Sequence, residues 1–124
     1  MARSNKEIVL EVLKRAFIDR DPTVVEQYFG NNYKQHNPLI PNGPSAIAAM
    51  IPTLTGLTYE PGMSVADGDL VMVHGRYTGW AMVAVDIFRV ESGRVVEHWD
   101  VMQEEVPASD SANGNSMFSA SEGK

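Results

Sequence analysis

Apolar residues recur every three or four positions near the start of the chain, and they alternate with polar residues in its second half. Over Ser4–Arg20 the spacing is helical, and Ser4 and Glu7 stand at the positions of a capping box. This segment is therefore predicted to be an amphipathic helix.

A second, short helix is predicted directly after the first one. Asp21-Pro22 is typical of an N-cap followed by proline at the first helical position, and Gly30 stands where a helix over Thr23–Phe29 needs a left-handed C-cap. Tyr33–Asn37 is predicted to be extended, because helical geometry is disfavoured in the residue before Pro38.

The remaining pattern predicts a loop, a third helix and a meander of strands. The loop spans Pro38–Pro44, and helical periodicity returns over Ser45–Leu57. Four strands follow, with turns at 67–69 and 92–93: Tyr59–Ala66, Leu70–Gly79, Met82–Val90 and Val95–Glu105. Helices followed by strands favour an α+β fold in which the helices pack on one face of a curved antiparallel sheet.

The last residues differ in composition from the rest of the chain. Residues 107–124 are rich in serine, and Met117 and Phe118 are their only large apolar side chains. We predict one domain over 1–106 and an extended or disordered tail over 107–124. Docking of Met117-Phe118 onto a groove of the same chain or of a second subunit is the alternative.

Composition limits the function classes. The 124 residues fit one domain, and the absence of cysteine excludes thiol nucleophiles, disulfides and zinc-cysteine sites. A formal net charge of -6 disfavours nucleic-acid binding, and no apolar stretch is long enough to span a membrane. No signal-peptide pattern follows the charged N-terminus, so a cytoplasmic location is expected.

Asp86 is an acidic residue inside an otherwise apolar strand. Burial of a carboxylate is costly unless the group is paired, hydrogen-bonded or protonated. A protonated Asp86 could donate a hydrogen bond in a catalytic site. The alternative is a salt bridge to Arg76 or Arg89 that only positions the strands.

His98 and Asp100 are predicted to be neighbours on one face of the last strand. Strand alternation places Val96, His98, Asp100 and Met102 together, opposite Val95, Glu97, Trp99 and Val101. An imidazole beside a carboxylate is suited to acid–base catalysis near neutral pH. The alternative is a solvent-facing pair with Trp99 inside, and a β-bulge between Val95 and His98 would reverse the faces.

The other two histidines carry weaker signals. His36 lies where the extended segment meets the proline loop, and His74 lies within a strand, so both could be structural. No two histidines have the i, i+4 spacing of a helical zinc motif, and we predict no metal ligands and no cofactor. Phosphate-binding loops and a nucleophile elbow are also missing from the sequence, which disfavours nucleotide binding and serine hydrolase chemistry.

Three segments together resemble the SnoaL-like polyketide cyclase family: YKQHNPLIPNG at 33–43, VHGRYTG at 73–79 and VDIFRVESGRVVEHWDVMQ at 85–103. The likeness covers about residues 5–106 and extends to the tail at 113–118. It implies the nuclear transport factor 2-like fold, a cone-shaped curved antiparallel sheet closed by N-terminal helices around an apolar pocket, commonly assembled as a homodimer.

The resemblance also implies roles for individual residues. Family members close an aldol ring without cofactor or metal, and Asp100 resembles their acid–base residue. Asp86 resembles the protonated acid with which the related ketosteroid isomerases stabilise an enolate oxygen. His36 and Asn37 stand in place of the isomerase's general base, which argues against steroid isomerisation. The predicted substrate contacts are Tyr33, Asn37, His74, Trp80, Phe88 and Trp99.

The sequence thus predicts a cofactor-independent lyase or isomerase that moves a proton next to a carbonyl of a small hydrophobic molecule. Asp100, tuned by His98, would move the proton, and Asp86 or His36 would donate to the carbonyl oxygen. One alternative is a hydrolase or dehydratase in which a carboxylate activates water. Another is a non-catalytic, ligand-binding dimer. In such a protein, replacing Asp86 or Asp100 with an apolar residue would raise the stability of the fold.

Overall fold

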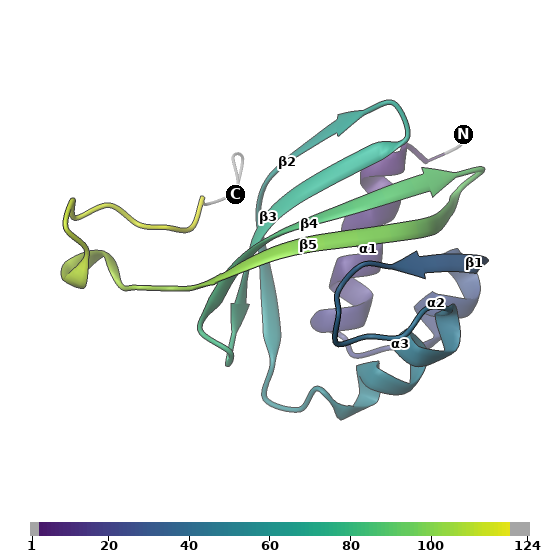
Figure 1. Cartoon of the computed structure of the whole chain (residues 1–124), viewed down its shortest axis with the longest axis horizontal. Helices are drawn as coiled ribbons and strands as arrows, with labels where there is room; N and C mark the ends of the chain where they lie inside the picture. Colours follow the sequence, from purple (N-terminus) through teal and green to yellow (C-terminus); the bar gives the residue numbers. More distant parts are fainter. Residues whose placement is uncertain (1–2, 120–124) are drawn as a thin grey trace.

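The computed structural model describes residues 3–119, in which helices precede a run of four strands (Figure 1). Met1, Ala2 and the last five residues of the predicted tail lie outside the described residues. The elements are α1 Asn5–Phe17, α2 Thr23–Tyr28, β1 Phe29–Gln35, α3 Pro44–Met50, η1 Ile51–Thr53, β2 Thr58–Asp67, β3 Leu70–Thr78, β4 Met82–Glu91, β5 Arg94–Glu104 and η2 Ala108–Asp110.

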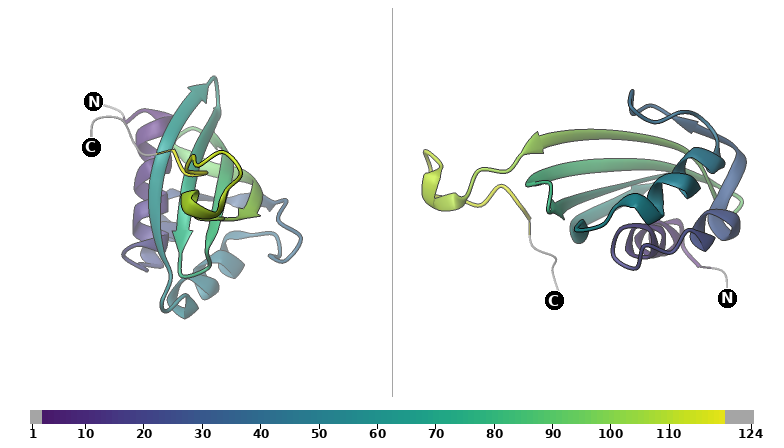
Figure 2. Two further views of the ribbon diagram at one scale, coloured as in Figure 1. Left: turned by 90° about the vertical axis from the view of Figure 1, so that its left-hand side faces the viewer. Right: turned by 90° about the horizontal axis from the view of Figure 1, so that it is seen from below.

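The strands form one open sheet in the order β1-β5-β4-β3-β2. β2 to β5 make the predicted antiparallel meander, and its tight turns have positive φ at Gly68 and at Ser92-Gly93, where turns are predicted. β1 is added at the edge, parallel to β5. The sheet curves over the helices, which lie along its concave face (Figure 2). The predicted α+β fold is therefore confirmed, with one parallel edge strand in addition.

The helix α1 begins at the predicted capping box. The Ser4 hydroxyl oxygen accepts from the Glu7 N–H at 3.0 Å, and the Ser4 N–H donates to Glu7 Oε1 at 2.8 Å. The apolar face of α1 is buried in the core: Ile8, Val9, Val12, Leu13 and Ala16.

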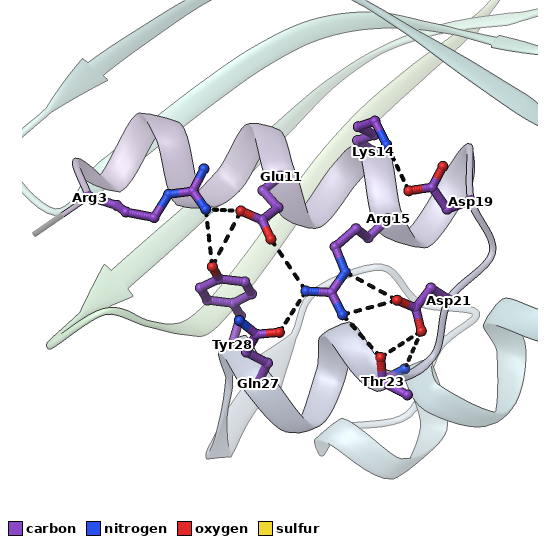
Figure 3. A network of polar contacts seen from close by, with 9 residues as sticks. All are labelled: Arg3, Glu11, Lys14, Arg15, Asp19, Asp21, Thr23, Gln27 and Tyr28. Atoms are coloured by element: carbon purple, nitrogen blue, oxygen red, sulfur yellow. Dashed lines mark hydrogen bonds and ion pairs between the residues drawn. The ribbon is translucent and has the colours of Figure 1, made fainter.

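Arg15 connects α1 to α2. Its guanidinium donates to Asp21 Oδ2 at 3.0 Å and to Gln27 Oε1 at 2.7 Å, within a network that also includes Glu11 (Figure 3). Partly exposed ion pairs of this kind contribute at most about 1 kcal/mol each. The network therefore sets the orientation of α2 more than it stabilises the fold.

The predicted end of the second helix is wrong. α2 ends at Tyr28, and Phe29 begins β1 as the register partner of Val95 in β5. Gly30 consequently lies in a strand, and it is not among the glycines with positive φ. Pairing with a distant strand outweighs the local C-cap signal here.

The third helix is shorter than predicted. α3 ends at Met50 instead of continuing to Leu57, and the chain passes into the 3-10 turn Ile51–Thr53. Pro52 explains the difference, because it has no N–H to continue the helical hydrogen bonds and its ring clashes with the preceding turn. No helix within residues 3–119 has the length and apolar character needed to cross a membrane.

A β-bulge reverses the faces predicted for the first residues of β5. The strand β4 pairs in succession with Glu97 and Val95 and skips Val96. Val95 is therefore fully buried in the core, whereas Val96 is only partly buried. Beyond the bulge the predicted alternation holds, and His98 lies on the concave face.

The chain after β5 runs away from the sheet, turns at η2 and returns towards β3 (Figure 1). It reaches the face that points away from the helices, which we call the outer face and which carries Met72, His74, Arg76, Val85, Ile87, Trp99 and Val101. The Arg76 guanidinium lies 4.4 Å from the centre of the Phe118 ring, and Ser119 Oγ lies 2.5 Å from His74 Nδ1. Phe118 thus docks on its own chain in this structure.

Candidate active site

A cavity of about 460 Å³ lies between the concave face of the sheet and the helices. Most of its wall is apolar, and its polar side chains gather in one region. A largely apolar cavity with a few convergent polar groups is typical of a small-molecule site. The polar and aromatic lining residues are Phe17, Phe29, Tyr33, Gln35, Asn37, Tyr77, Trp80, Asp86, Phe88, His98 and Asp100.

Strand register brings the central groups together. Asp86 of β4 is the direct partner of Asp100 in β5, and His98 lies two residues earlier on the same face of β5. Gln35 at the end of β1 is the register partner of His98. Two carboxylates in directly opposite positions repel each other, so the arrangement needs a proton or a cation nearby. The imidazole of His98 is placed to supply it.

The Asp86 carboxylate is 3% exposed and uses both oxygens in hydrogen bonds. Oδ1 lies 2.8 Å from His98 Nε2, and Oδ2 accepts from the Tyr77 hydroxyl at 2.7 Å. Burial, and then the charge of Asp86, raise the pKa of Tyr77 well above its usual value. Tyr77 therefore stays protonated and keeps donating, which fixes Asp86 and, through it, the imidazole.

The alternative interpretation of Asp86, a salt bridge to Arg76 or Arg89, is wrong. Both arginines point to the outer face of the sheet. Arg76 pairs with Glu105 at 2.7 Å, and Arg89 pairs with Glu97 at 3.1 Å. The partners of Asp86 are a histidine and a tyrosine that belong to the cavity.

Asp100 is held less tightly than Asp86. Its Oδ2 accepts a hydrogen bond from Asn37 Nδ2 at 2.9 Å and lies 3.8 Å from His98 Nε2. Within residues 3–119, Asn37 is the one group that donates to this carboxylate. Asp100 also lines the cavity, so it has acceptor capacity available for a ligand.

Tyr33 offers a hydrogen-bond donor to the cavity. Its hydroxyl oxygen accepts from Gln35 Nε2 at 2.8 Å, and no described group accepts the Tyr33 hydroxyl hydrogen. Burial raises the pKa of Tyr33 far above its ordinary value, so this hydrogen is retained. It can therefore be donated to an oxygen atom of a bound molecule.

The structure brings together seven of the predicted site residues. Besides the groups described above, Phe88 packs against His98 with ring centres 4.8 Å apart, and Trp80 stacks on Tyr77 at 5.7 Å. Trp80 is 46% exposed and forms part of the rim. The seven are Tyr33, Asn37, Trp80, Asp86, Phe88, His98 and Asp100.

Three predicted site residues lie elsewhere. His36 stacks on Trp99 at 4.7 Å with parallel rings, and its Nε2 lies 2.7 Å from Glu97. His74 lies on the outer face beside Phe118. None of the three lines the cavity.

Two polar residues of the site were not predicted. Tyr77 follows the same strand alternation as the buried Val71 and Val73, so the sequence pattern already indicated that its side chain points to the core side of the sheet. Gln35 carries no such signal, because its contact with His98 depends on pairing between strands about 60 residues apart.

One group of side chains within the described residues could hold a metal ion. The ligand atoms of Asp86, His98 and Asp100 all lie within 4.8 Å of one another. Both oxygens of Asp86 and Nε2 of His98 already take part in hydrogen bonds that satisfy them. Asp86 and His98 therefore have hydrogen-bond partners without a cation, Asp100 keeps acceptor capacity, and the absence of a metal or cofactor stays a prediction.

Comparison with known proteins identifies the family. The model of the SnoaL-like domain matches residues 9–98, and the chain belongs to this family. None of the curated proteins compared with the chain matches it.

Solved structures share the fold at low sequence identity. TsrD from Streptomyces laurentii is 20% identical over 83% of this chain and 91% of its own, with a TM-score of 0.69. An NTF2-like protein of unknown function from Cytophaga hutchinsonii is 13% identical over 83% and 93%, with a TM-score of 0.73. A proposed polyketide cyclase from Acidithiobacillus ferrooxidans is 15% identical over 83% and 92%, with a TM-score of 0.68.

Proposed function

We propose that the protein is a cofactor-independent lyase or isomerase that transfers a proton next to a carbonyl group of a small hydrophobic ligand. One observation carries this proposal: a hydrogen-bonded chain of Tyr77, Asp86 and His98, with Asp100 beside it, at one side of an apolar cavity. The likeness to a proposed polyketide cyclase supports aldol-type cyclisation or isomerisation as the reaction class.

The contacts of each group suggest its role. Asp100 has acceptor capacity facing the cavity, so it takes the proton from the carbon next to the carbonyl, and the electron pair of that C–H bond forms the enolate. Tyr33 donates to the oxygen on which negative charge develops. His98 exchanges a proton with the carboxylates beside it. In isomerisation the proton returns to carbon, whereas in cyclisation the enolate carbon attacks a second carbonyl and the alkoxide oxygen that forms takes the proton.

This assignment changes two of the roles predicted from the sequence. Asp86 has no free oxygen with which to bind a substrate carbonyl, so we assign it to holding His98. His36 lies outside the cavity, so Tyr33 takes the place of His36 as the donor. Asp100 keeps its predicted role.

Exchange of solvent deuterium into ketones tests the proposal without knowledge of the natural substrate. The protein is mixed with a panel of β-diketones and cyclic ketones in heavy water, and NMR follows the loss of the acidic C–H signals. We expect wild-type protein to catalyse exchange and His98→Gln to lose most of it. His36→Gln is the matched control and is expected to retain it, because this histidine lies on the outer side of β5.

The proposed function fails if no compound in the panel exchanges faster than in buffer, or if His98→Gln exchanges as fast as wild type. Catalysed gain or loss of water without exchange would favour the hydrolase or dehydratase alternative.

We further propose that the outer face binds a second copy of the chain, as the family resemblance implies. Val101 and Met72 lie on this face and are 68% and 40% exposed. Such a patch is typical of an interaction site. The proposed location is the cytoplasm.

Sedimentation equilibrium tests the proposed homodimer. We expect wild type to sediment as a dimer and Val101→Glu as a monomer, because a charge at the centre of an apolar interface loses its hydration on association. Val106→Glu is the control and is expected to remain a dimer, because the exposed Val106 lies beyond the end of β5. A monomeric wild type, or a dimer unaffected by Val101→Glu, would contradict the proposal.

A further inference from the structure

We propose that Gln35 is a positioning residue that keeps a proton on Nδ1 of His98, so that Nε2 is the nitrogen that exchanges a proton with the two aspartates. The effect on catalysis rests on the proposed function. The protonation pattern of His98 does not rest on it, and it can be measured separately.

The orientation of the Gln35 amide follows from its other hydrogen bonds. Its oxygen end, Oε1, accepts from the backbone N–H of Asn37 at 3.0 Å. It also lies 3.1 Å from the backbone nitrogen of His36, whose N–H is shared with the carbonyl oxygen of His98. Both backbone groups are donors, so the atom they contact must be the oxygen and not the amide nitrogen. The amide nitrogen is directed to the Tyr33 hydroxyl at 2.8 Å, which can accept from it.

This orientation decides which ring nitrogen of His98 carries the proton. His98 Nδ1 lies 2.6 Å from Gln35 Oε1, and an amide oxygen can only accept. Nδ1 must therefore be the donor. In the neutral imidazole the second nitrogen, Nε2, then has a lone pair.

The lone pair of Nε2 points at the carboxylates. Nε2 lies 2.8 Å from Asp86 Oδ1 and 3.8 Å from Asp100 Oδ2. A contact of 2.8 Å between a ring nitrogen and a carboxylate oxygen needs one proton between them, on either the imidazole or the aspartate. With Nδ1 fixed by Gln35, the mobile proton of the site is confined to the Nε2 side, next to Asp100.

The local structure explains how Gln35 reaches this position. Gln35 is the last residue of β1 and the register partner of His98 in the parallel pair. The same short segment places Asn37 against Asp100 and turns His36 to the outer side. Residues 35–37 therefore position both the imidazole and the base.

Nitrogen-15 NMR of histidine-labelled protein tests the proposal directly, since protonated and unprotonated ring nitrogens differ strongly in chemical shift. The full chain is compared with Gln35→Met, which keeps the length of the side chain but can neither accept from Nδ1 nor donate to Tyr33. Gln103→Leu, an exposed glutamine of β5, is the matched control. A backbone amide spectrum of each variant confirms that it is folded.

Across a pH titration we expect wild type and Gln103→Leu to keep Nδ1 of His98 protonated throughout. In Gln35→Met the neutral ring is expected to carry its proton on Nε2, where Asp86 can accept it. Gln35→Glu retains an acceptor for Nδ1 and is expected to restore the wild-type pattern. In the exchange assay, Gln35→Met should lower kcat roughly tenfold to a hundredfold with little change in KM, as expected when a catalytic histidine adopts the wrong tautomer.

A neutral His98 ring that keeps its proton on Nδ1 in Gln35→Met, or that carries it on Nε2 in wild type, would overturn the proposal. If wild type catalyses no exchange, the proposed function fails, whereas the NMR result still decides the role of Gln35 in fixing the tautomer.

Discussion

Replacing Asp100 with asparagine is expected to slow the proposed proton transfer by a factor of roughly 10² to 10⁴, the range that a positioned general base supplies. The amide has nearly the same shape as the carboxylate, and its oxygen can still accept from Asn37, which now contacts Asp100 at 2.9 Å. The free energy of unfolding should therefore change by less than about 1 kcal/mol. The rate is measured by deuterium exchange and the stability by urea unfolding.

Asp110→Asn is the control for this substitution, because Asp110 is exposed in η2, outside the cavity. Asp110→Asn should change neither the exchange rate nor the free energy of unfolding. An Asp100→Asn variant that is folded and exchanges protons at the wild-type rate would remove Asp100 from the mechanism, whichever substrate is used.

The central residues of the site were predictable because strand alternation is a local property. Alternation within each strand decides which face Asp86, His98 and Asp100 occupy, because all three lie beyond the bulge. The register that places Asp86 opposite Asp100 depends on the turn at Ser92-Gly93 together with the bulge at Val96. A bulge such as the one at Val96 could have reversed the faces predicted for His98 and Asp100. The observed bulge reverses only the first residues of β5, because the alternation restarts after the extra residue.

The contacts of β1 were not predictable in the same way. The segment preceding Pro38 was expected to be extended, but nothing in its sequence says that it pairs with β5, or in which direction. The role of Gln35 depends on that pairing. The same pairing turns the neighbouring His36 outward onto Trp99, away from the cavity. Reasoning from the sequence therefore pointed to Asp86, His98 and Asp100, which line the cavity, and missed Gln35, which contacts His98.

Replacing Asp86 with leucine is expected to lower the free energy of unfolding by about 3–5 kcal/mol, the usual cost of removing one partner of a buried charged contact. Asp86 accepts from Tyr77 and contacts His98, and both partners are at least nine-tenths buried. Without the carboxylate, the Tyr77 hydroxyl and His98 Nε2 both lose their hydrogen-bond partner inside the core. Urea unfolding monitored by circular dichroism measures the change.

The structure therefore revises what an apolar substitution at Asp86 can reveal. The sequence alone suggested that such a change would raise stability in a protein that only binds a ligand, but this ignores the two groups that depend on the carboxylate. Removing all three polar groups together, as Asp86→Leu, Tyr77→Phe and His98→Leu, should recover much of the lost stability while abolishing proton transfer. If Asp86→Leu alone is as stable as wild type, the hydrogen-bonded chain contributes little to the fold, and Asp86 cannot be what holds His98 in place.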